Sequence, residues 1–284
     1  MDIGRRQLLV GSAALMAFSG VASGSPSGVT PVPRQVGSGQ LASSPVVRGR
    51  LALKTRIKAI TNVFETGTPA TDYAYAEDLN DGRGLTVTSY GFCTYVDEVT
   101  KVIKRYDTLV PETTLSGYLL FLPPAGSGVE MAKLDGFVEA WRQENSISGL
   151  LASICEKVAD QLYFNPSVKF AHRAGIASHA GHAIIYDTLL QHGDDDGDAD
   201  SLNAIYRQTV LQTGWPDKGQ EPDMLRGFLE TRREVLAKPS NQATAKVWAE
   251  SLPRVDALIA LLDENPQLSA PVRVHNSQVD TTVP

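Results

Sequence analysis

Glu65 and Asp81 lie in one short, acidic stretch of the sequence, and their immediate neighbours differ. The segment "FETGTPATDYAYAEDLNDGRGLT" (residues 64–86) carries five carboxylates, and its only basic side chain is Arg83. Cleavage of a glycosidic bond needs one protonated carboxyl group, which donates to the leaving oxygen, and one ionised carboxylate. Burial favours the protonated form, whereas cations and hydrogen bonds favour the ionised form. We therefore expect Glu65, beside Phe64, to be the acid, and Asp81, beside Arg83, to be the ionised partner.

Each of these two residues also has an ordinary structural interpretation. An Asp in "DGRG" is usually a turn residue, and a Glu near a helix end is usually solvated. The two glycines of that turn, Gly82 and Gly84, would let the backbone approach a substrate closely. The residues alone do not decide between these interpretations.

The elements around the two carboxyl groups can be predicted from local patterns. Apolar residues recur at intervals of three and four in "RGRLALKTRIKAITNVFE" (48–65), which predicts an amphipathic helix that Gly67 and Pro69 terminate. β-Branched and aromatic residues dominate 85–95, after the turn signal "NDGRG", and indicate a small sheet or hairpin.

The rest of the chain reads as mostly helical. Helices are predicted over 96–106, 129–143, 146–161, 166–191, 200–213, 221–237 and 242–263. The 166–191 segment is rich in Ala, Gly and Ser and is interpreted as a single central helix. The tail after Pro266 is expected to be irregular. We therefore predict a mainly α (α+β) fold with a small β-sheet near the N-terminal part.

The N-terminal residues are predicted to lie outside the fold. Residues 1–24 have a charged start with Arg5 and Arg6, a short apolar run and small residues at the end, as in an export signal peptide. The paired arginines indicate the twin-arginine type, with an ordinary secretory signal as the alternative. Residues 25–46 are rich in Ser, Pro and Gly and read as a flexible leader, so the folded part is expected over 47–284. The mature protein is expected to be secreted and extracellular.

Composition narrows the class of protein. The chain has 284 residues, of which 42% are hydrophobic, so a substantial core can form. Its net charge of −6 argues against nucleic acid as a partner and is compatible with a cationic one. We expect a monomer that does not bind a membrane. Cys93 and Cys155 could form a disulfide or remain two buried thiols, and the sequence leaves both open.

No metal or cofactor is expected. The predicted central helix carries His172, His179 and His182, but their spacing differs from the usual i,i+4 helical metal pattern. The acidic segment "HGDDDGDADS" (192–201) does not place ligands where a calcium-binding EF-hand loop requires them. A polar helix face and a solvated loop are the simpler interpretations.

An ordered set of motifs resembles the glycoside hydrolase family 46 chitosanases. The acidic segment resembles the family's signature, in which a Glu on a helix precedes "DGRG" and then "GF". Further matches are "QLYFNPSVKFAHRAG" (161–175), "AIIYDTLLQHG" (183–193), "GFLETRRE" (227–234) and "RVD" (254–256). The similarity is collinear over about residues 50–262. It implies a lysozyme-like fold of two helical lobes around a substrate cleft, and endo-acting hydrolysis of β-1,4 bonds in chitosan.

The resemblance also implies roles for individual residues. Glu65 would be the general acid and Asp81 the general base of an inverting reaction, with Thr86 helping to hold the attacking water. The substrate cleft would be lined by Tyr75, Arg83, Gly91, Asp97 and His192. Asp97 would face a glucosamine ammonium, although the spacing leaves Glu98 as an alternative. A buried charge network behind Glu65 would consist of Asp187, Arg232 and Arg254.

The chain also departs from the family pattern. Thr66 and Leu85 replace the usual Asn and Tyr, and Thr94-Tyr95-Val96 replaces a "GTG" turn, which affects the expected subsite preference. Together with Asp97, the carboxylates Asp72, Glu77 and Asp78 would attract a polycation such as chitosan. The alternative functions are a peptidoglycan muramidase or lytic transglycosylase and, in another class, a non-catalytic binding protein for glucosamine polymers.

Overall fold

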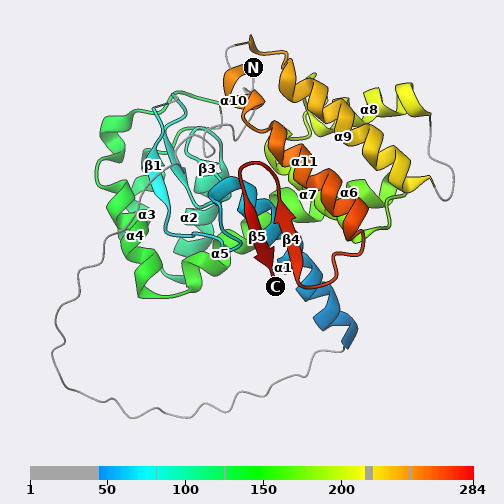
Figure 1. Cartoon of the computed structure of the whole chain (residues 1–284). Helices are drawn as coiled ribbons and strands as arrows, with labels where there is room; N and C mark the ends of the chain where they lie inside the picture. The colour runs from blue at the N-terminus through cyan, green and yellow to red at the C-terminus, as the bar shows by residue number, and fades with distance from the viewer. Residues whose placement is uncertain (1–44, 81, 125, 215–219, 243–244) are drawn as a thin grey trace.

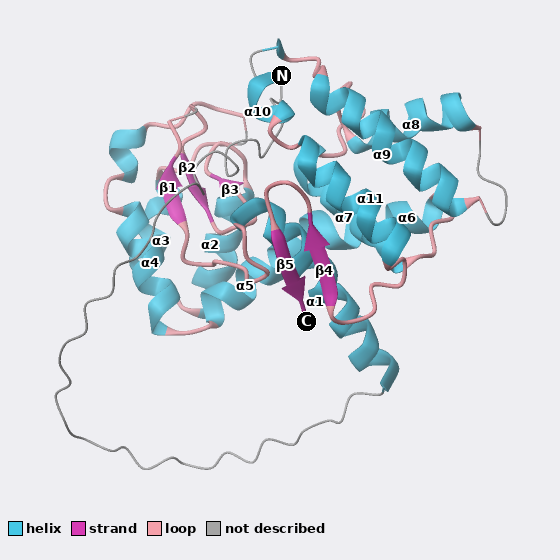
Figure 2. Cartoon of the chain, viewed as in Figure 1, coloured by secondary structure: helices cyan, strands magenta, loops and turns pink. Residues whose placement is uncertain are grey.

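The chain folds into two lobes with one long helix between them (Figures 1 and 2). This computed structural model describes residues 45–80, 82–124, 126–214, 220–242 and 245–284. The fold is mainly helical with a small antiparallel sheet in the N-terminal part, which confirms the predicted fold class. A single cluster of buried apolar side chains extends through both lobes.

Helix α1 (Pro45–Thr66) is the helix between the lobes. The predicted amphipathic stripe understates its burial, because every residue from Ile57 to Val63 is buried. Both lobes bind it: Lys58 pairs with Glu156 at 2.5 Å and with Asp160 at 2.6 Å, whereas α7 of the second lobe packs along its length. The helix ends at Thr66, and the next residue, Gly67, has a φ of 75° in the left-handed region.

The first lobe carries the sheet. Strands β1 (Ala76–Asp78), β2 (Leu85–Val87) and β3 (Phe92–Cys93) form it in the order β1-β2-β3, with Glu77 opposite Thr86 and Thr86 opposite Cys93. The helical part of this lobe comprises α2 (Glu98–Leu109), α3 (Thr114–Gly117), η1 (Tyr118–Leu120), η2 (Met131–Leu134), α4 (Phe137–Ile147) and α5 (Leu150–Ala159). The sequence predicted this sheet but placed the helix bounds several residues away.

The second lobe is helical. A π-helical turn, η3 (Asp160–Phe164), leads into it from α5, and its helices are α6 (Asn165–Arg173), α7 (His179–His192), α8 (Leu202–Thr213), α9 (Glu221–Ala237), α10 (Ala245–Ala249) and α11 (Leu252–Glu264). Helices α9 and α11 pack against each other, and α11 also packs against α7. The bounds of α9 are those predicted from the sequence.

The single central helix predicted over 166–191 is wrong. The chain forms α6 and α7 instead, with a break at Gly175, whose φ is 71°. Ser178 then caps α7 by accepting a hydrogen bond from the Gly181 amide at 3.0 Å. The small residues do allow close packing: a Cβ on Gly181 would lie 2.4 Å from the Ile176 side chain. The predicted helix 242–263 likewise divides into α10 and α11, with Pro253 in the first turn of α11.

The C-terminal tail is ordered, contrary to the sequence prediction. Residues 272–283 form an antiparallel hairpin of β4 (Val272–His275) and β5 (Asp280–Val283), with Val272 paired to Val283. Val272, Val274 and Val283 point into the core. Each strand is only four residues long, which is why the alternation of buried and exposed side chains is a weak signal in the sequence.

The predicted signal peptide (1–24) and most of the predicted leader lie outside the described residues. The last two leader residues, Pro45 and Val46, begin α1. Within the described part of the chain, no helix combines the length and the apolar character that a membrane span requires.

Candidate active site

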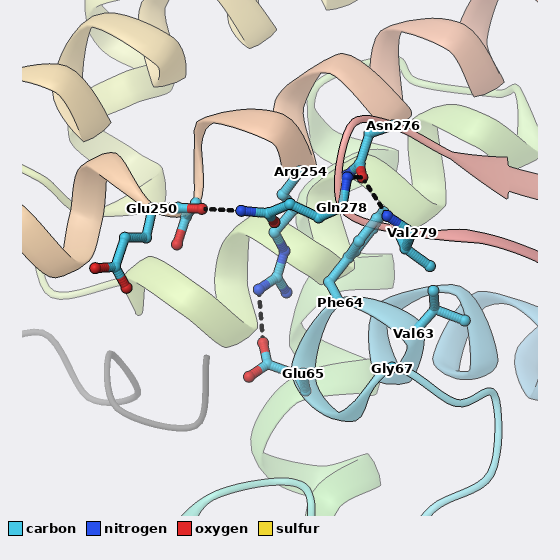
Figure 3. A pocket seen from close by; sticks show the side chains of 10 residues that line it. Val63, Phe64, Glu65, Gly67, Glu250, Arg254, Asn276, Gln278 and Val279 are labelled. Atoms are coloured by element: carbon cyan, nitrogen blue, oxygen red, sulfur yellow. Dashed lines mark hydrogen bonds and ion pairs between the residues drawn. The ribbon is translucent and has the colours of Figure 1, made fainter. Parts of the chain in front are cut away.

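Glu65 lies in the last turn of α1 and lines a cavity of about 340 Å³ (Figure 3). Its side chain is only 2% exposed, so the carboxyl group is shielded from bulk water. Phe64, its neighbour in the sequence, also lines the cavity. The opposite wall comes from the start of α11 and from the turn of the C-terminal hairpin, which are far from Glu65 in the sequence.

Behind Glu65, two arginines enclose one buried aspartate. Asp187, on α7, is fully buried. It forms ion pairs with Arg254 Nη2 at 2.7 Å and with Arg232 Nη2 at 2.8 Å. Arg254 Nε also donates to both Asp187 oxygens, at 3.0 and 2.9 Å. The remaining nitrogen of Arg254, Nη1, donates to Glu65 Oε1 at 2.7 Å. The structure therefore joins Glu65, Asp187, Arg232 and Arg254, the four residues that the resemblance grouped together.

The network keeps its internal charges ionised. Burial acts to raise the pKa of Asp187, but the two guanidinium groups, Arg254 first, outweigh it and leave that pKa below its usual range. Burial lowers the pKa of Arg232 to about 10, against the attraction of Asp187. Asp187 therefore offsets much of the positive charge that Glu65 meets in Arg254. The Glu65 carboxyl faces an ion pair rather than an isolated cation.

The two oxygens of Glu65 are in different situations. Oε1 accepts a hydrogen bond from Arg254 Nη1, and Oε2 makes no hydrogen bond to the described side chains. A carboxyl group held by one oxygen is fixed in orientation, and its other oxygen remains available to carry a proton. Burial of this kind is typical of carboxyl groups that act as general acids.

The sheet carries the predicted partner residues of Glu65. Asp81 lies outside the described residues; in the sequence it stands between the residues of β1 and those of β2. Thr86, on β2, is 3% exposed, and its Oγ1 finds no hydrogen-bond partner among the described residues. Such an unpaired buried hydroxyl group is costly and often bonds to water. Thr86 therefore has the properties expected of a residue that holds a water molecule.

Residues 83–85 are fixed by contacts with residues 94 and 95. Arg83 is half-buried, and its carbonyl accepts from the Tyr95 amide at 3.1 Å. Gly84 has a φ of 77°, and a Cβ there would lie 2.2 Å from Thr94 Oγ1. Thr94 Oγ1 itself accepts from the Leu85 amide at 3.0 Å. Residues 94 and 95, which replace the family's "GTG" turn, thus fix this loop.

The other predicted cleft residues on the sheet side have local partners. The Tyr75 hydroxyl donates to Glu77 at 2.9 Å. The pKa of Tyr75 is raised, first by burial and then by the hydrogen bond to Glu77 and the negative charge of that residue. Gly91 is buried, with a φ of 69° that suits glycine. Asp97, at the start of α2, is half-exposed and pairs with Lys101 at 2.8 Å.

The structure separates the two candidates for the ammonium-binding carboxylate. Glu98 is buried, accepts from the Cys93 amide at 3.2 Å, and also accepts from the Tyr163 hydroxyl. Asp97 is therefore the one of the pair that a substrate can reach.

His192 does not line an open surface, contrary to the cleft position implied by the resemblance. It is 3% exposed, its Nδ1 bonds to the Asp200 carbonyl at 2.8 Å, and its Nε2 accepts from Arg232 Nε at 3.2 Å. Burial, and then the charge of Arg232, lower its pKa well below the usual value. His192, at the end of α7, is thus a neutral member of the buried network. It contacts Arg232 of α9.

Four residues of the cavity belong to no motif recognised in the sequence. Glu250 and Ser251, between α10 and α11, and Asn276 and Gln278, in the hairpin turn, line the cavity of Glu65. Polar residues in short connections are common, and only the fold brings these four to residue 65. The only local hint was the run of polar residues 275–278 between two valine-containing segments.

The cysteines and histidines form no site within the described residues. Cys93 and Cys155 are both buried free thiols, which resolves the alternatives left open by the sequence. His179 Nδ1 bonds to the Gln267 carbonyl at 2.8 Å, and no group of three potential metal ligands occurs in the part of the chain described.

Comparison with known proteins relates this chain to one family. The family model described as glycosyl hydrolase family 46 matches residues 59–272. A chitosanase of Bacillus subtilis (strain 168) is 34% identical over 230 residues, which cover 79% of this chain and 82% of that protein. A chitosanase of Streptomyces sp. (strain N174) is 28% identical over 199 residues, covering 69% of this chain and 70% of that protein.

Solved structures of similar fold come from the same group of proteins. The native chitosanase of Bacillus subtilis MY002 matches with a TM-score of 0.75 and 33% identity, over 82% of this chain and 98% of that one. A Gynuella sunshinyii chitosanase in complex with chitotetraose matches with a TM-score of 0.74 and 32% identity, with the same two coverages.

Proposed function

The chain belongs to glycosyl hydrolase family 46, and we propose that it is a secreted chitosanase that cleaves internal β-1,4 bonds of chitosan with inversion at the anomeric carbon. Membership of the family supports a glycosidase that acts on chitosan. The observation that carries the assignment of residues is the position of Glu65, a buried carboxyl group that opens onto a cavity and is fixed through one oxygen by Arg254.

In this proposal Glu65 is the general acid. Its Oε2 carries the proton to the glycosidic oxygen as the bond to the anomeric carbon breaks. The carboxylate that remains keeps its hydrogen bond from Arg254, which stabilises the developing negative charge. Asp187 holds Arg254 in place and limits its pull on Glu65 before the proton is transferred.

Asp81 is the proposed general base. It would take a proton from a water molecule that attacks the opposite face of the sugar, and Thr86 Oγ1 would help to hold that water. An inverting reaction needs room for this water, so the two carboxyl groups should be at least ~6.5 Å apart. The assignment of Asp81 rests on the resemblance of the "DGRG" segment to the family pattern.

The proposed substrate-binding carboxylate is Asp97, which would face the ammonium group of a glucosamine unit. Exposed Glu77 near the same sheet adds negative charge for a polycation. The proposed signal peptide in residues 1–24 would direct the enzyme out of the cell, and we propose that it acts as a monomer without a cofactor.

The proposal can be tested by comparing two polymers. The purified protein should release reducing ends from chitosan and lower its viscosity early, as an endo-acting enzyme does, and should leave peptidoglycan intact. Proton NMR of the first products should show the anomeric configuration opposite to that of the substrate. Cleavage of peptidoglycan alone would support the lysozyme-like alternative. Binding of chitosan without any shortening would support a binding protein that has lost catalysis.

A further inference from the structure

The C-terminal hairpin touches both of the helices that bring Glu65 and Arg254 together. Strand β5 packs against α1, which carries Glu65, and β4 packs against α11, which carries Arg254. Figure 1 shows the hairpin beside α1 and α11, and its Val272, Val274 and Val283 side chains are buried. The family model ends at Val272, the first residue of β4, so the family match itself says nothing about this element.

On the side of α1, one arginine fixes the hairpin. Arg56 Nη1 donates to the Leu268 carbonyl at 3.0 Å, just before β4, and Arg56 Nε donates to the Pro284 carbonyl at 3.3 Å, just after β5. Both ends of the hairpin are thereby tied to α1, the helix that carries Glu65 in its last turn.

On the side of α11, the hairpin turn holds the corner between α10 and α11. Asn276 Nδ2 donates to the Pro253 carbonyl at 2.8 Å, and Gln278 Nε2 donates to the Glu250 carbonyl at 3.3 Å (Figure 3 shows the second bond). The N-cap of α11, Ser251, makes no side-chain capping bond. The corner that presents Arg254 therefore depends on contacts from outside its own helix.

Asn276 has two separable tasks. Its Oδ1 accepts from the Gln278 amide at 2.7 Å and from the Val279 amide at 2.8 Å, which shapes the turn. Its Nδ2 is the atom that reaches Pro253, the neighbour of Arg254. A substitution that keeps the oxygen but removes the amide NH₂ would break the second contact while preserving the first.

We propose that the C-terminal hairpin sets the distance between Arg254 and Glu65, and that Asn276 is a positioning residue for the proton donor. This inference rests on the proposed role of Glu65 as general acid. The hairpin acts as a brace across the two helices, so that Arg254 Nη1 meets Glu65 Oε1 in the orientation that directs Oε2 into the cavity. Asn276 acts through the corner of α11 and need not touch the sugar.

The test compares three substitutions in the hairpin of the full-length enzyme. Asn276→Asp keeps the acceptor of the turn and removes the donor to Pro253. Gln278→Ala removes the donor to Glu250. Arg273→Gln is the matched control, because Arg273 pairs with Asp280 at 2.7 Å across the exposed face of the same hairpin. kcat and KM on chitosan and the Tm should be measured for each.

We expect Asn276→Asp to lower kcat by about tenfold to a hundredfold, without a rise in KM, as expected for misplacement of a catalytic group. Gln278→Ala should lower kcat less, since its bond is longer, and Arg273→Gln should leave kcat unchanged. If Asn276→Asp does not fold, Gln278→Ala still provides the comparison with the control.

Two results would overturn the inference. The hairpin would be merely structural if Asn276→Asp and Gln278→Ala lowered the Tm but kept the kcat of the control. It would be a sugar-contacting element if their loss of activity appeared only in KM. Neither result affects the proposed function, which fails separately if the wild-type enzyme does not cleave chitosan or if Glu65→Gln remains active.

Discussion

Arg254 connects Asp187 to Glu65 through a single guanidinium group. Nε and Nη2 of Arg254 donate to Asp187, and Nη1 donates to Glu65 at 2.7 Å. All three nitrogens of this guanidinium group therefore bond to one of two carboxyl groups. The proposed acid is thus held by a cation whose charge is already shared. This arrangement can fix the orientation of Glu65 without the full electrostatic pull of an unpaired arginine.

Replacement of Glu65 by Gln should abolish most of the hydrolysis while the protein stays folded. The amide can still accept from Arg254 through its oxygen, but it cannot donate the proton that the leaving group requires, so kcat should fall by about 10²- to 10⁴-fold. Initial rates on chitosan and a thermal unfolding curve measure the two effects. Glu130→Gln, at an exposed ion pair with Lys133, is the control. Near-normal turnover by the Glu65 variant would refute the assignment.

Replacement of Asp187 by Asn should destabilise the protein strongly. The substitution leaves two buried guanidinium groups without their shared carboxylate, and the loss of one partner of a buried ion pair typically costs about 3–5 kcal/mol. Urea unfolding at pH 7 would measure the change. A loss no larger than that of an exposed pair such as Arg207–Asp196 would show that Asp187 does not hold the network together.

Thr86→Val should separate activity from stability. The hydroxyl group has no partner among the described residues, so its removal should leave the Tm unchanged or raise it. Activity should nevertheless fall by about tenfold or more if the hydroxyl positions the attacking water. Thr209→Val is the matched control, because its hydroxyl donates to the Ile205 carbonyl at 2.9 Å in the second lobe. That variant should lose stability and keep kcat.

Lys101 should compete with a cationic substrate for Asp97. The two side chains pair at 2.8 Å and both are about half-exposed, so the pair contributes little, roughly 0.2–1 kcal/mol. Lys101→Gln should therefore lower KM for chitosan by up to about fivefold, and Asp97→Asn should raise it. Both effects should shrink at high salt. Unchanged KM values in both variants would remove Asp97 from the substrate site.

The buried histidine predicts a pH dependence of stability. Burial and Arg232 lower the pKa of His192 well below 6.5, so the folded protein keeps it neutral, whereas the unfolded chain takes up this proton near pH 6.5. The contribution of neutral His192 to the free energy of unfolding is therefore present above pH 6.5. It decreases as the pH falls below this value, by up to about 1.4 kcal/mol per pH unit.

Urea unfolding between pH 7 and pH 5 should show this decrease, and His192→Gln should show a smaller slope. His172→Gln, at an exposed position in α6, is the control and should keep the wild-type slope. Equal slopes for His192→Gln and the wild type would contradict a neutral buried His192. Asp187, whose pKa is lowered in the folded state, should add a further loss only at more acidic pH.

Local sequence patterns predicted the helices whose formation depends mainly on their own residues. The apolar spacing before Glu65 gave α1, and the bounds of α9 follow from its own periodicity. The break at Gly175 was missed because composition alone does not show which glycine adopts a left-handed conformation. The β4–β5 hairpin was missed because its short strands are stabilised by packing on α1 and α11 rather than by their own pattern.

The site was predictable only in part, for a related reason. The contact between Glu65 and Arg254 spans 189 positions, and no periodicity in the sequence encodes it. It was anticipated through the family resemblance, residue by residue. That route also put His192 at an open cleft, where the structure has it buried against Arg232. No motif marked Glu250 and Gln278. They were identified as cavity residues only from the folded structure, in which they lie near Glu65.

The burial of α1 by both lobes restricts how the molecule can move. Lys58 is bound by Glu156 of the first lobe, and one turn further on the Thr61 hydroxyl donates to Asp187 of the second lobe at 3.0 Å. Both lobes are thus bonded to the same stretch of α1, so neither can move away from this helix without losing one of these bonds. Glu65, the proposed proton donor, lies one turn beyond Thr61 on this helix, so contacts from both lobes fix its position.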